Sequence, residues 1–71
     1  MDRSLVEEAF TYHQPTPEMR DSMLKIRAYA KELAFVILEE CPSSADRSDA
    51  LRKLREVVFA ANSSIVLNGI I

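Results

Sequence analysis

A chain of 71 residues with a net charge of −2 has room for one domain, and its acidic balance argues against a binder of DNA or RNA polymers. One cysteine excludes an internal disulfide, and one cysteine with one histidine makes no ligand set for a metal. Because so short a chain buries only about 60% of its unfolded surface, a 48% hydrophobic composition with a single glycine favours an all-α fold stabilised by self-association.

The chain shows no sign of a membrane segment. No apolar run approaches the roughly 18 residues of a membrane span, and the first residues lack the basic and apolar segments of a signal sequence. We therefore expect a soluble, intracellular protein with no membrane partner, no metal and no cofactor.

The first predicted helix covers about residues 2–10. Asp2 or Ser4 can cap its N-terminus. Phe10, at its end, is expected to pack within this short apolar patch. The apolar residues of the segment are Leu5, Val6, Ala9 and Phe10.

The second predicted helix covers about residues 17–41. Thr16 is the expected N-cap, and Pro17 takes the first helical position. Cys41, at the apolar end of this helix, is expected to be packed rather than reactive, since free cysteines are usually buried. An apolar seam, typical of a close-packed helix pair, comprises Met19, Met23, Ile26, Ala30, Leu33 and Ile37.

The third predicted helix covers about residues 44–68. Pro42 ends the helix before it, residues 43–46 resemble a capping box, and Asn68-Gly69 supplies a left-handed C-cap. The short link makes the two long helices an antiparallel hairpin, each about 35 Å long at 1.5 Å per residue. We expect residues 1–71 to form one helical hairpin domain. The seam of the third helix comprises Leu51, Leu54, Val58, Ala61 and Ile65.

Both long helices carry more apolar residues than a hairpin needs. A surplus of this kind predicts partner helices, most simply further copies of the chain, and hence a homo-oligomer. A small helical adaptor that binds another protein through these faces is the alternative. The surplus residues are Leu24, Tyr29, Phe35, Val36, Leu38, Val57, Phe59 and Val66.

Three cations share one flank of the second helix. At 100° per residue, Arg20, Arg27 and Lys31 fall within about 40° of one another, beside the seam. They predict either a phosphate site or a solvated flank that pairs with glutamates of the third helix. Tyr12 either stacks on a nucleotide base or packs the linker against the second helix. His13 either contacts a ligand or bonds to backbone in a capped turn.

A second candidate anion site lies at the start of the third helix. Ser43, Ser44 and Arg47 surround free backbone amides there, although helix capping also explains the serines. Asn62, with the two serines after it, either lines a pocket or faces water. No nucleophile or paired acid accompanies His13 in sequence, and no glycine-rich phosphate loop is present. We therefore predict that the protein is not an enzyme.

Three stretches resemble a family of short phage proteins that share the helical hairpin domain of the anti-CBASS and anti-Thoeris sponges. They are FTYHQP at 10–15, AKELA at 30–34 and CPSSADRSDALRKLREVVFAANSSI at 41–65. The resemblance implies a compact helical homo-oligomer, typically a hexamer, that sequesters cyclic nucleotide signals without cleaving them. It implies action in the cytoplasm of an infected bacterial host, where effectors are deprived of their signal.

The resemblance also implies roles for particular residues. In the cyclic dinucleotide sponges, a Tyr before the long helix stacks on purines, a Lys fifteen residues later binds phosphate, and two protomers close over one ligand. Tyr12 and Arg27 have that separation here, with Arg in place of Lys. His13 fits the family's Tyr-His step. Some members also hold cyclic trinucleotides or cyclic ADP-ribose derivatives at another site.

Overall fold

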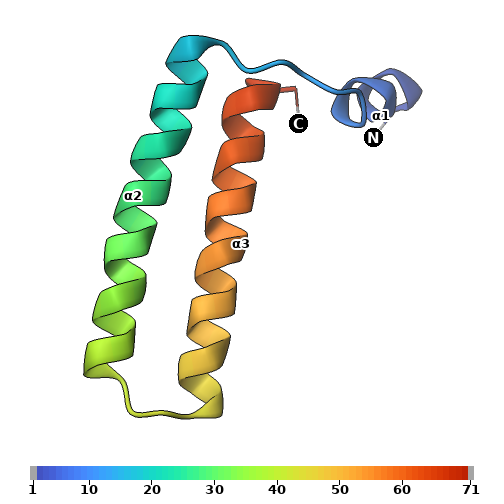
Figure 1. Cartoon of the computed structure of the whole chain (residues 1–71). Helices are drawn as coiled ribbons and strands as arrows, with labels where there is room; N and C mark the ends of the chain where they lie inside the picture. The colour runs from blue at the N-terminus through green and yellow to red at the C-terminus, as the bar shows by residue number, and fades with distance from the viewer. Residues whose placement is uncertain (1, 71) are drawn as a thin grey trace.

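The computed structural model describes residues 2–70, which form three helices and no strand (Figure 1). They are α1 (Arg3–Ala9), α2 (Pro17–Glu40) and α3 (Ala45–Leu67). These bounds differ by at most one residue from the ranges 2–10, 17–41 and 44–68. The predicted order of a short helix followed by an antiparallel hairpin of two long helices is confirmed. Whether 1–71 acts as a single domain stays a prediction.

Side-chain caps fix where the first two helices begin. The carboxylate of Asp2 accepts a 2.9 Å hydrogen bond from the backbone amide of Leu5. The hydroxyl of Thr16 accepts one of 3.1 Å from the amide of Met19, with Pro17 at the first helical position. Each bond satisfies one of the amides that a helix start leaves without an intrahelical partner.

The two ends of α3 differ in how well the sequence predicted them. Asn68 and Gly69 have φ angles of 49° and 87°, so the left-handed C-cap is confirmed. The capping box is wrong, because the N-cap is Ser44 and the residue three positions later is Arg47, which cannot return the acidic bond. The Ser44 hydroxyl accepts from the Arg47 amide at 3.1 Å and donates to the Pro42 carbonyl at 3.0 Å.

The seam between α2 and α3 is shallow. Val58 is the one buried hydrophobic residue of the described chain, and most of the predicted seam is half-buried. Leu33 is an exception, being 48% exposed, and Ala34 takes its place. At 100° per residue, Leu33 and Ala34 lie equally far, about 50°, on either side of the centre of the stripe that Ala30 and Ile37 define, so the position of α3 decides which of the two faces it.

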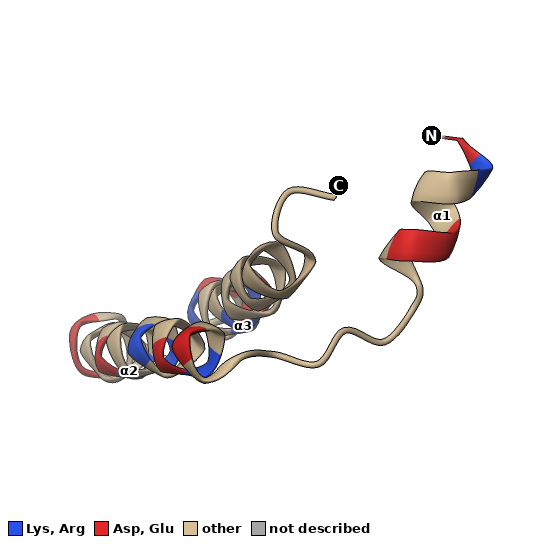
Figure 2. Ribbon diagram, turned by 90° about the horizontal axis from the view of Figure 1, so that it is seen from above, with Lys and Arg blue, Asp and Glu red and all other residues tan. Residues whose placement is uncertain are grey.

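The protomer is extended, and α1 stands apart from the hairpin (Figures 1 and 2). The Cα radius of gyration is 15.3 Å, against about 11 Å for a compact domain of this length. No residue of α1 is buried, and Phe10 beyond it is 86% exposed. The prediction that Phe10 packs with the first helix is therefore wrong for this protomer.

Large apolar side chains remain exposed on both long helices, as the surplus of such residues in the sequence predicted. Cys41 is exposed as well, so its predicted packing is wrong for the protomer, because α2 ends there and no other element covers it. Across residues 2–70, no helix has both the length and the apolar character needed to cross a membrane. The large apolar residues exposed on α2 and α3 are Leu24, Tyr29, Leu33, Phe35, Val36, Leu38, Val57 and Phe59.

Candidate functional site

Tyr12 lies in the linker between α1 and α2 with its ring in solvent. Tyr12 is 78% exposed, and its hydroxyl donates a 3.0 Å hydrogen bond to Oε1 of Gln14. An exposure this high is incompatible with packing of the linker against α2, so that interpretation is wrong for the protomer. The hydroxyl is hydrogen-bonded to Gln14 and the ring is exposed to solvent, so the ring is accessible for stacking on a base.

His13 ties the same linker back to α1. Its Nε2 lies 2.6 Å from the carbonyl oxygen of Glu8, and since a carbonyl only accepts, Nε2 carries the proton. The hydroxyl of Thr11 donates to the carbonyl of Glu7 at 2.6 Å. Both carbonyls belong to the last turn of α1, where intrahelical partners run out. The imidazole bonded to backbone is thus the arrangement that the structure shows, and it orients the linker carrying Tyr12.

The three cations of α2 lie along one continuous strip. Arg20 and Arg27 line a groove of about 270 Å³ near the start of α2. Arg27 and Lys31 line a second groove, of about 250 Å³, between α2 and α3. Because Arg27 belongs to both, the strip is unbroken. Lys25 lines a different, apolar groove with Tyr29.

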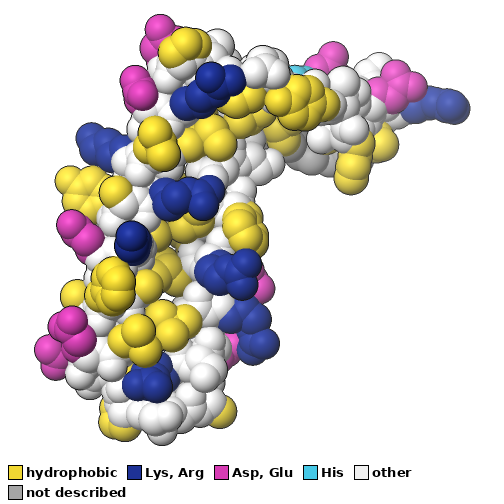
Figure 3. Space-filling model, in the orientation of Figure 1, with side chains coloured by type: hydrophobic (Ala, Val, Ile, Leu, Met, Phe, Trp, Pro, Cys, Tyr) yellow, Lys and Arg dark blue, Asp and Glu magenta, His cyan; other side chains and the backbone are white. Residues whose placement is uncertain are grey.

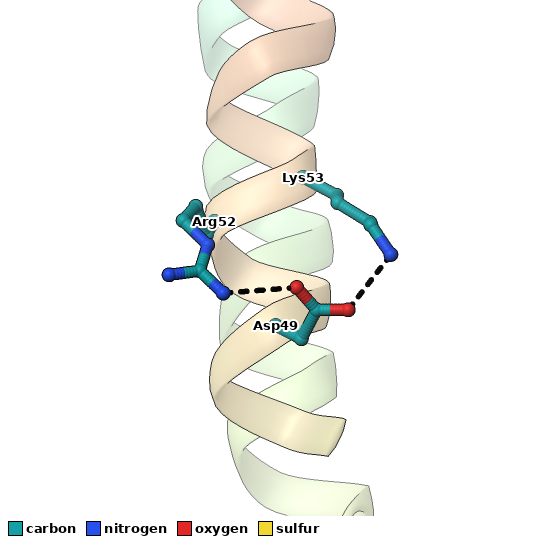
Figure 4. Close-up of polar contacts among 3 residues, drawn as sticks. All are labelled: Asp49, Arg52 and Lys53. Carbon is teal, nitrogen blue, oxygen red and sulfur yellow. Dashed lines mark hydrogen bonds and ion pairs between the residues drawn. The ribbon is translucent and has the colours of Figure 1, made fainter. Parts of the chain in front are cut away.

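The expected pairing of this strip with glutamates of α3 is not what the structure shows. Within residues 2–70, the ion pairs join Asp49 to Arg52 at 3.1 Å and to Lys53 at 2.7 Å, both on α3 (Figure 4). Hydrogen bonds from Lys53 and then Arg52 lower the pKa of Asp49, and Asp49 raises the pKa of Lys53. The carboxylate of Asp49 is therefore paired with cations of its own helix and not with those of α2.

The α3 residue that lines the groove beside Arg27 and Lys31 is another cation, Arg55. Its guanidinium carbon lies 5.6 Å from the ring centre of Phe59, a cation–π distance. Sequence reasoning missed both residues as members of the site. Helical angles would have found Arg55, because it lies about 40° from the seam residue Leu51.

Charge is unevenly distributed over the hairpin. Figure 3 shows positive side chains along α2 and across onto α3, among apolar ones, with negative side chains at the outer edge of α2, on α1 and, partly hidden, at the edge of α3. Arg27, Lys31 and Arg55 all line the 250 Å³ groove, and none of its described lining residues is acidic. Although the net charge of the chain is −2, this cluster of cations gives one face a positive potential that favours binding of an anion.

One protomer does not bring Tyr12 and Arg27 together. The linker leaves α2 at its N-terminal end (Figure 1), and Arg27 lies about 15 Å further along the helix axis at 1.5 Å per residue. The two grooves that Arg27 lines include no residue of the linker. Within one protomer, therefore, Tyr12 and Arg27 do not line a common groove.

The sequence matches a known protein family. The family model described as Acb2/Tad1, hairpin domain, matches residues 1–66. The chain belongs to the Acb2/Tad1 hairpin family. Comparison with curated proteins and with solved structures gave no match. Membership in the Acb2/Tad1 family implies a phage sponge for cyclic nucleotides, a protein that binds its target rather than converting it.

In the second candidate anion site of this Acb2/Tad1 hairpin, the side chains of Ser44 and Arg47 are hydrogen-bonded to the backbone. Nη1 of Arg47 donates to the carbonyls of Leu38 and Cys41, at 3.5 and 3.4 Å, and so closes the end of α2. Ser44 caps α3, and Ser43 is exposed. These contacts give Arg47 and Ser44 structural roles in the turn.

The remaining polar features of this Acb2/Tad1 hairpin are Asn62 and the residues that could bind a metal ion. Asn62 is half-buried, and its Oδ1 is buried with no hydrogen-bond partner within residues 2–70. No cluster of three or more His, Cys, Asp or Glu in that range is arranged to hold a metal ion.

Proposed function

We propose that this protein sequesters cyclic oligonucleotide second messengers, cyclic dinucleotides first, and releases them unchanged. Signals of CBASS- or Thoeris-type immunity would thereby be withheld from their effectors in the cytoplasm of the infected bacterial host. The family match over residues 1–66 is the observation that carries the proposal. The exposed ring of Tyr12 and the cationic strip on α2 supply groups suited to bases and phosphates.

The proposed site combines residues of two protomers. Tyr12 stacks on a base, Arg27 forms forked hydrogen bonds to a phosphate, and Lys31 and Arg20 add positive charge along the same strip. His13 holds the linker through its bond to Glu8. A cyclic dinucleotide has two bases and two phosphates, so a two-fold pair of protomers would offer it one Tyr12 and one Arg27 from each side.

The proposed assembly is a compact homo-oligomer, with a hexamer expected from the family, in which residues 1–71 act as one hairpin domain. A seam with only Val58 buried among the described residues supports association, because so little burial leaves an isolated 71-residue protomer marginal. The exposed apolar residues of both helices supply the surface that further copies would cover.

A capture-and-release assay tests the function. A panel of cyclic di- and trinucleotides and cyclic ADP-ribose derivatives is mixed with micromolar protein, and the free nucleotide is measured before and after digestion of the protein. Capture followed by recovery of unchanged mass is expected. If every nucleotide stays free, the sponge proposal is wrong, and a product of altered mass would reveal an enzyme.

A helical adaptor for another protein is the second candidate, favoured by the apolar groove of about 360 Å³ that includes Tyr29, Leu33 and Val57. Light scattering separates the two functions. A closed homo-oligomer of fixed size supports the sponge, whereas a monomer that associates without a defined end point supports the adaptor.

A further inference from the structure

The groove between α2 and α3 carries one arginine that the proposed site does not use. Arg55 lines it from α3, opposite the contribution of Arg27 and Lys31 from α2. The floor between them is apolar, formed by alanine, leucine and valine side chains of both helices. An anion held there would therefore meet positive charge from both helices above an apolar floor, with the three cationic side chains exposed and accessible to it.

Other positive side chains of α3 already have partners. Arg52 and Lys53 share the carboxylate of Asp49, and Arg47 is bonded to backbone carbonyls of the turn. Within residues 2–70, Arg55 makes no ion pair, and the contact that the structure shows for its guanidinium is the ring of Phe59 at 5.6 Å. Three like charges around one groove repel one another, so a bound anion stabilises the arrangement.

The contact with Phe59 prepares Arg55 for an anion. The guanidinium carbon lies 5.6 Å from the ring centre of Phe59, and a cation–π contact of this kind uses the charge of the guanidinium without using its five N–H donors. The donors thus remain available for a forked contact to phosphate oxygens. The ring restricts the rotamers of Arg55, so less side-chain entropy is lost on binding.

The size of the groove indicates how much of a ligand it takes. Its volume of about 250 Å³ lies below the 300–1,000 Å³ usual for complete small-molecule sites. A phosphate with its attached sugar edge fits such a space, and a whole cyclic dinucleotide does not. The bases would then extend beyond the groove, toward the Tyr12 ring of a second protomer.

We infer that Arg55, held over Phe59, is a phosphate-binding residue that completes the anion site of Arg27 and Lys31 from α3. This inference rests on the proposed sponge function for the identity of the ligand. The chemical class that the groove itself selects is a phosphate ester or a pyrophosphate-like anion.

The test uses calorimetric titration of the protein, in the assembly it adopts in solution, with cyclic di-AMP, cyclic di-GMP and inorganic pyrophosphate. Arg55→Ala is expected to weaken dinucleotide binding about 10- to 100-fold, the range for losing hydrogen bonds to a charged group. Arg55→Lys is expected to lose less, because the ammonium keeps the charge without the fork. Arg52→Ala is the matched control on the same helix, and its affinity is expected to stay within about twofold of the wild type because Arg52 is paired with Asp49.

The outcomes separate this inference from the sponge proposal. Equal affinities for Arg55→Ala and Arg52→Ala, with wild-type capture intact, overturn the role of Arg55 and leave the sponge standing. Pyrophosphate binding that depends on Arg55, without dinucleotide capture, supports the anion groove and contradicts a cyclic dinucleotide sponge. If neither dinucleotide nor pyrophosphate binds, the inference is wrong. Light scattering of Arg55→Glu serves as a further check, because a changed oligomer size would show that a second copy occupies the groove instead.

Discussion

The two faces of the hairpin share a floor and differ in their rims. Ala30, Leu54 and Val58 line both the 250 Å³ groove on one face and the 360 Å³ groove on the other. The first rim adds Arg27, Lys31 and Arg55, and the second adds Lys25 together with Tyr29, Leu33 and Val57. A single thin seam therefore separates a cationic surface from a mainly apolar one.

The difference indicates different occupants for the two faces. An apolar surface gains free energy by removal from water, which another copy of the chain provides. Burying unpaired cations in such an interface would cost free energy, so the cationic face is better matched to an anion. We therefore expect the apolar face to lie in the oligomer interface and the cationic face to hold the ligand.

The largest effect is expected from a charge placed on the apolar face. Val57→Asp would bury an unpaired carboxylate at the proposed interface, at a cost of several kcal/mol, so dissociation of the oligomer should increase on the order of 100-fold or more. Size-exclusion chromatography with light scattering measures this directly. Dinucleotide capture should fall as well, because the site needs two protomers.

Ser22→Asp supplies the control for this experiment. Ser22 is exposed on α2 and lies outside the lining of the grooves described above, and the substitution adds the same charge. Its oligomer should keep the wild-type size. An unchanged oligomer in Val57→Asp would place the interface elsewhere and remove the distinction between the faces.

The next effect concerns the exposed aromatic ring of Tyr12. Tyr12→Ala should weaken dinucleotide capture about 5- to 100-fold, since base stacking on an aromatic side chain contributes about 1–3 kcal/mol. Tyr12→Phe should bind within about twofold of the wild type, because the hydroxyl is bonded to Gln14 and the ring faces remain. Equilibrium dialysis of all three proteins decides the matter. Equal loss in both variants would assign the contribution to the hydroxyl instead of the ring.

How far the sequence predicted this molecule depends on the scale of the interaction. Thr16, Pro17 and Asn68 act through bonds within a few residues, and their roles as helix-end signals were correct. Leu33 was misplaced because a repeating three-and-four spacing tolerates a shift of one residue, and only the position of α3 resolves it. Phe10 and Cys41 were expected to pack, yet one protomer offers nothing to cover them.

The candidate site shows the same division. The strip of Arg20, Arg27 and Lys31 follows from helical angles alone, and the structure places these residues around adjoining grooves. Helical angles place Arg55 beside the seam of α3, but its position across a groove from Arg27, 28 positions earlier in the chain, depends on α3 lying beside α2. The pairing of Tyr12 with Arg27 stays a prediction from the family resemblance, because no groove of the protomer is lined by both.

A smaller effect distinguishes a structural from a ligand role for the turn. Arg47→Ala removes two weak hydrogen bonds to the end of α2, about 0.5 kcal/mol together, which should lower the melting temperature by about 2–4 °C. Calorimetric melting measures this loss. Capture of cyclic di-AMP should not change, because the turn lies at the opposite end of the hairpin from the linker (Figure 1). Weakened binding of a cyclic trinucleotide with no change in melting would support the second anion site of Ser43, Ser44 and Arg47.

The smallest effect is expected at the Asp49 cluster (Figure 4). The pKa of Asp49 is lowered by Lys53 and Arg52, so its contribution to stability is present above the ordinary value of 3.8 and is lost as pH falls through the folded pKa. Asp49→Asn should therefore lower the melting temperature slightly at neutral pH, and the difference should vanish in acid. Because the variant removes a negative charge from α3, it also makes the net charge of that helix more positive at a residue outside the groove lining. If binding depends on Arg27, Lys31 and Arg55 at the groove itself, dinucleotide affinity in Asp49→Asn should stay within about twofold of the wild type at physiological salt, where exposed charges are screened beyond about 8 Å. A marked gain in affinity would show that overall charge, and not the arrangement of the groove, attracts the ligand.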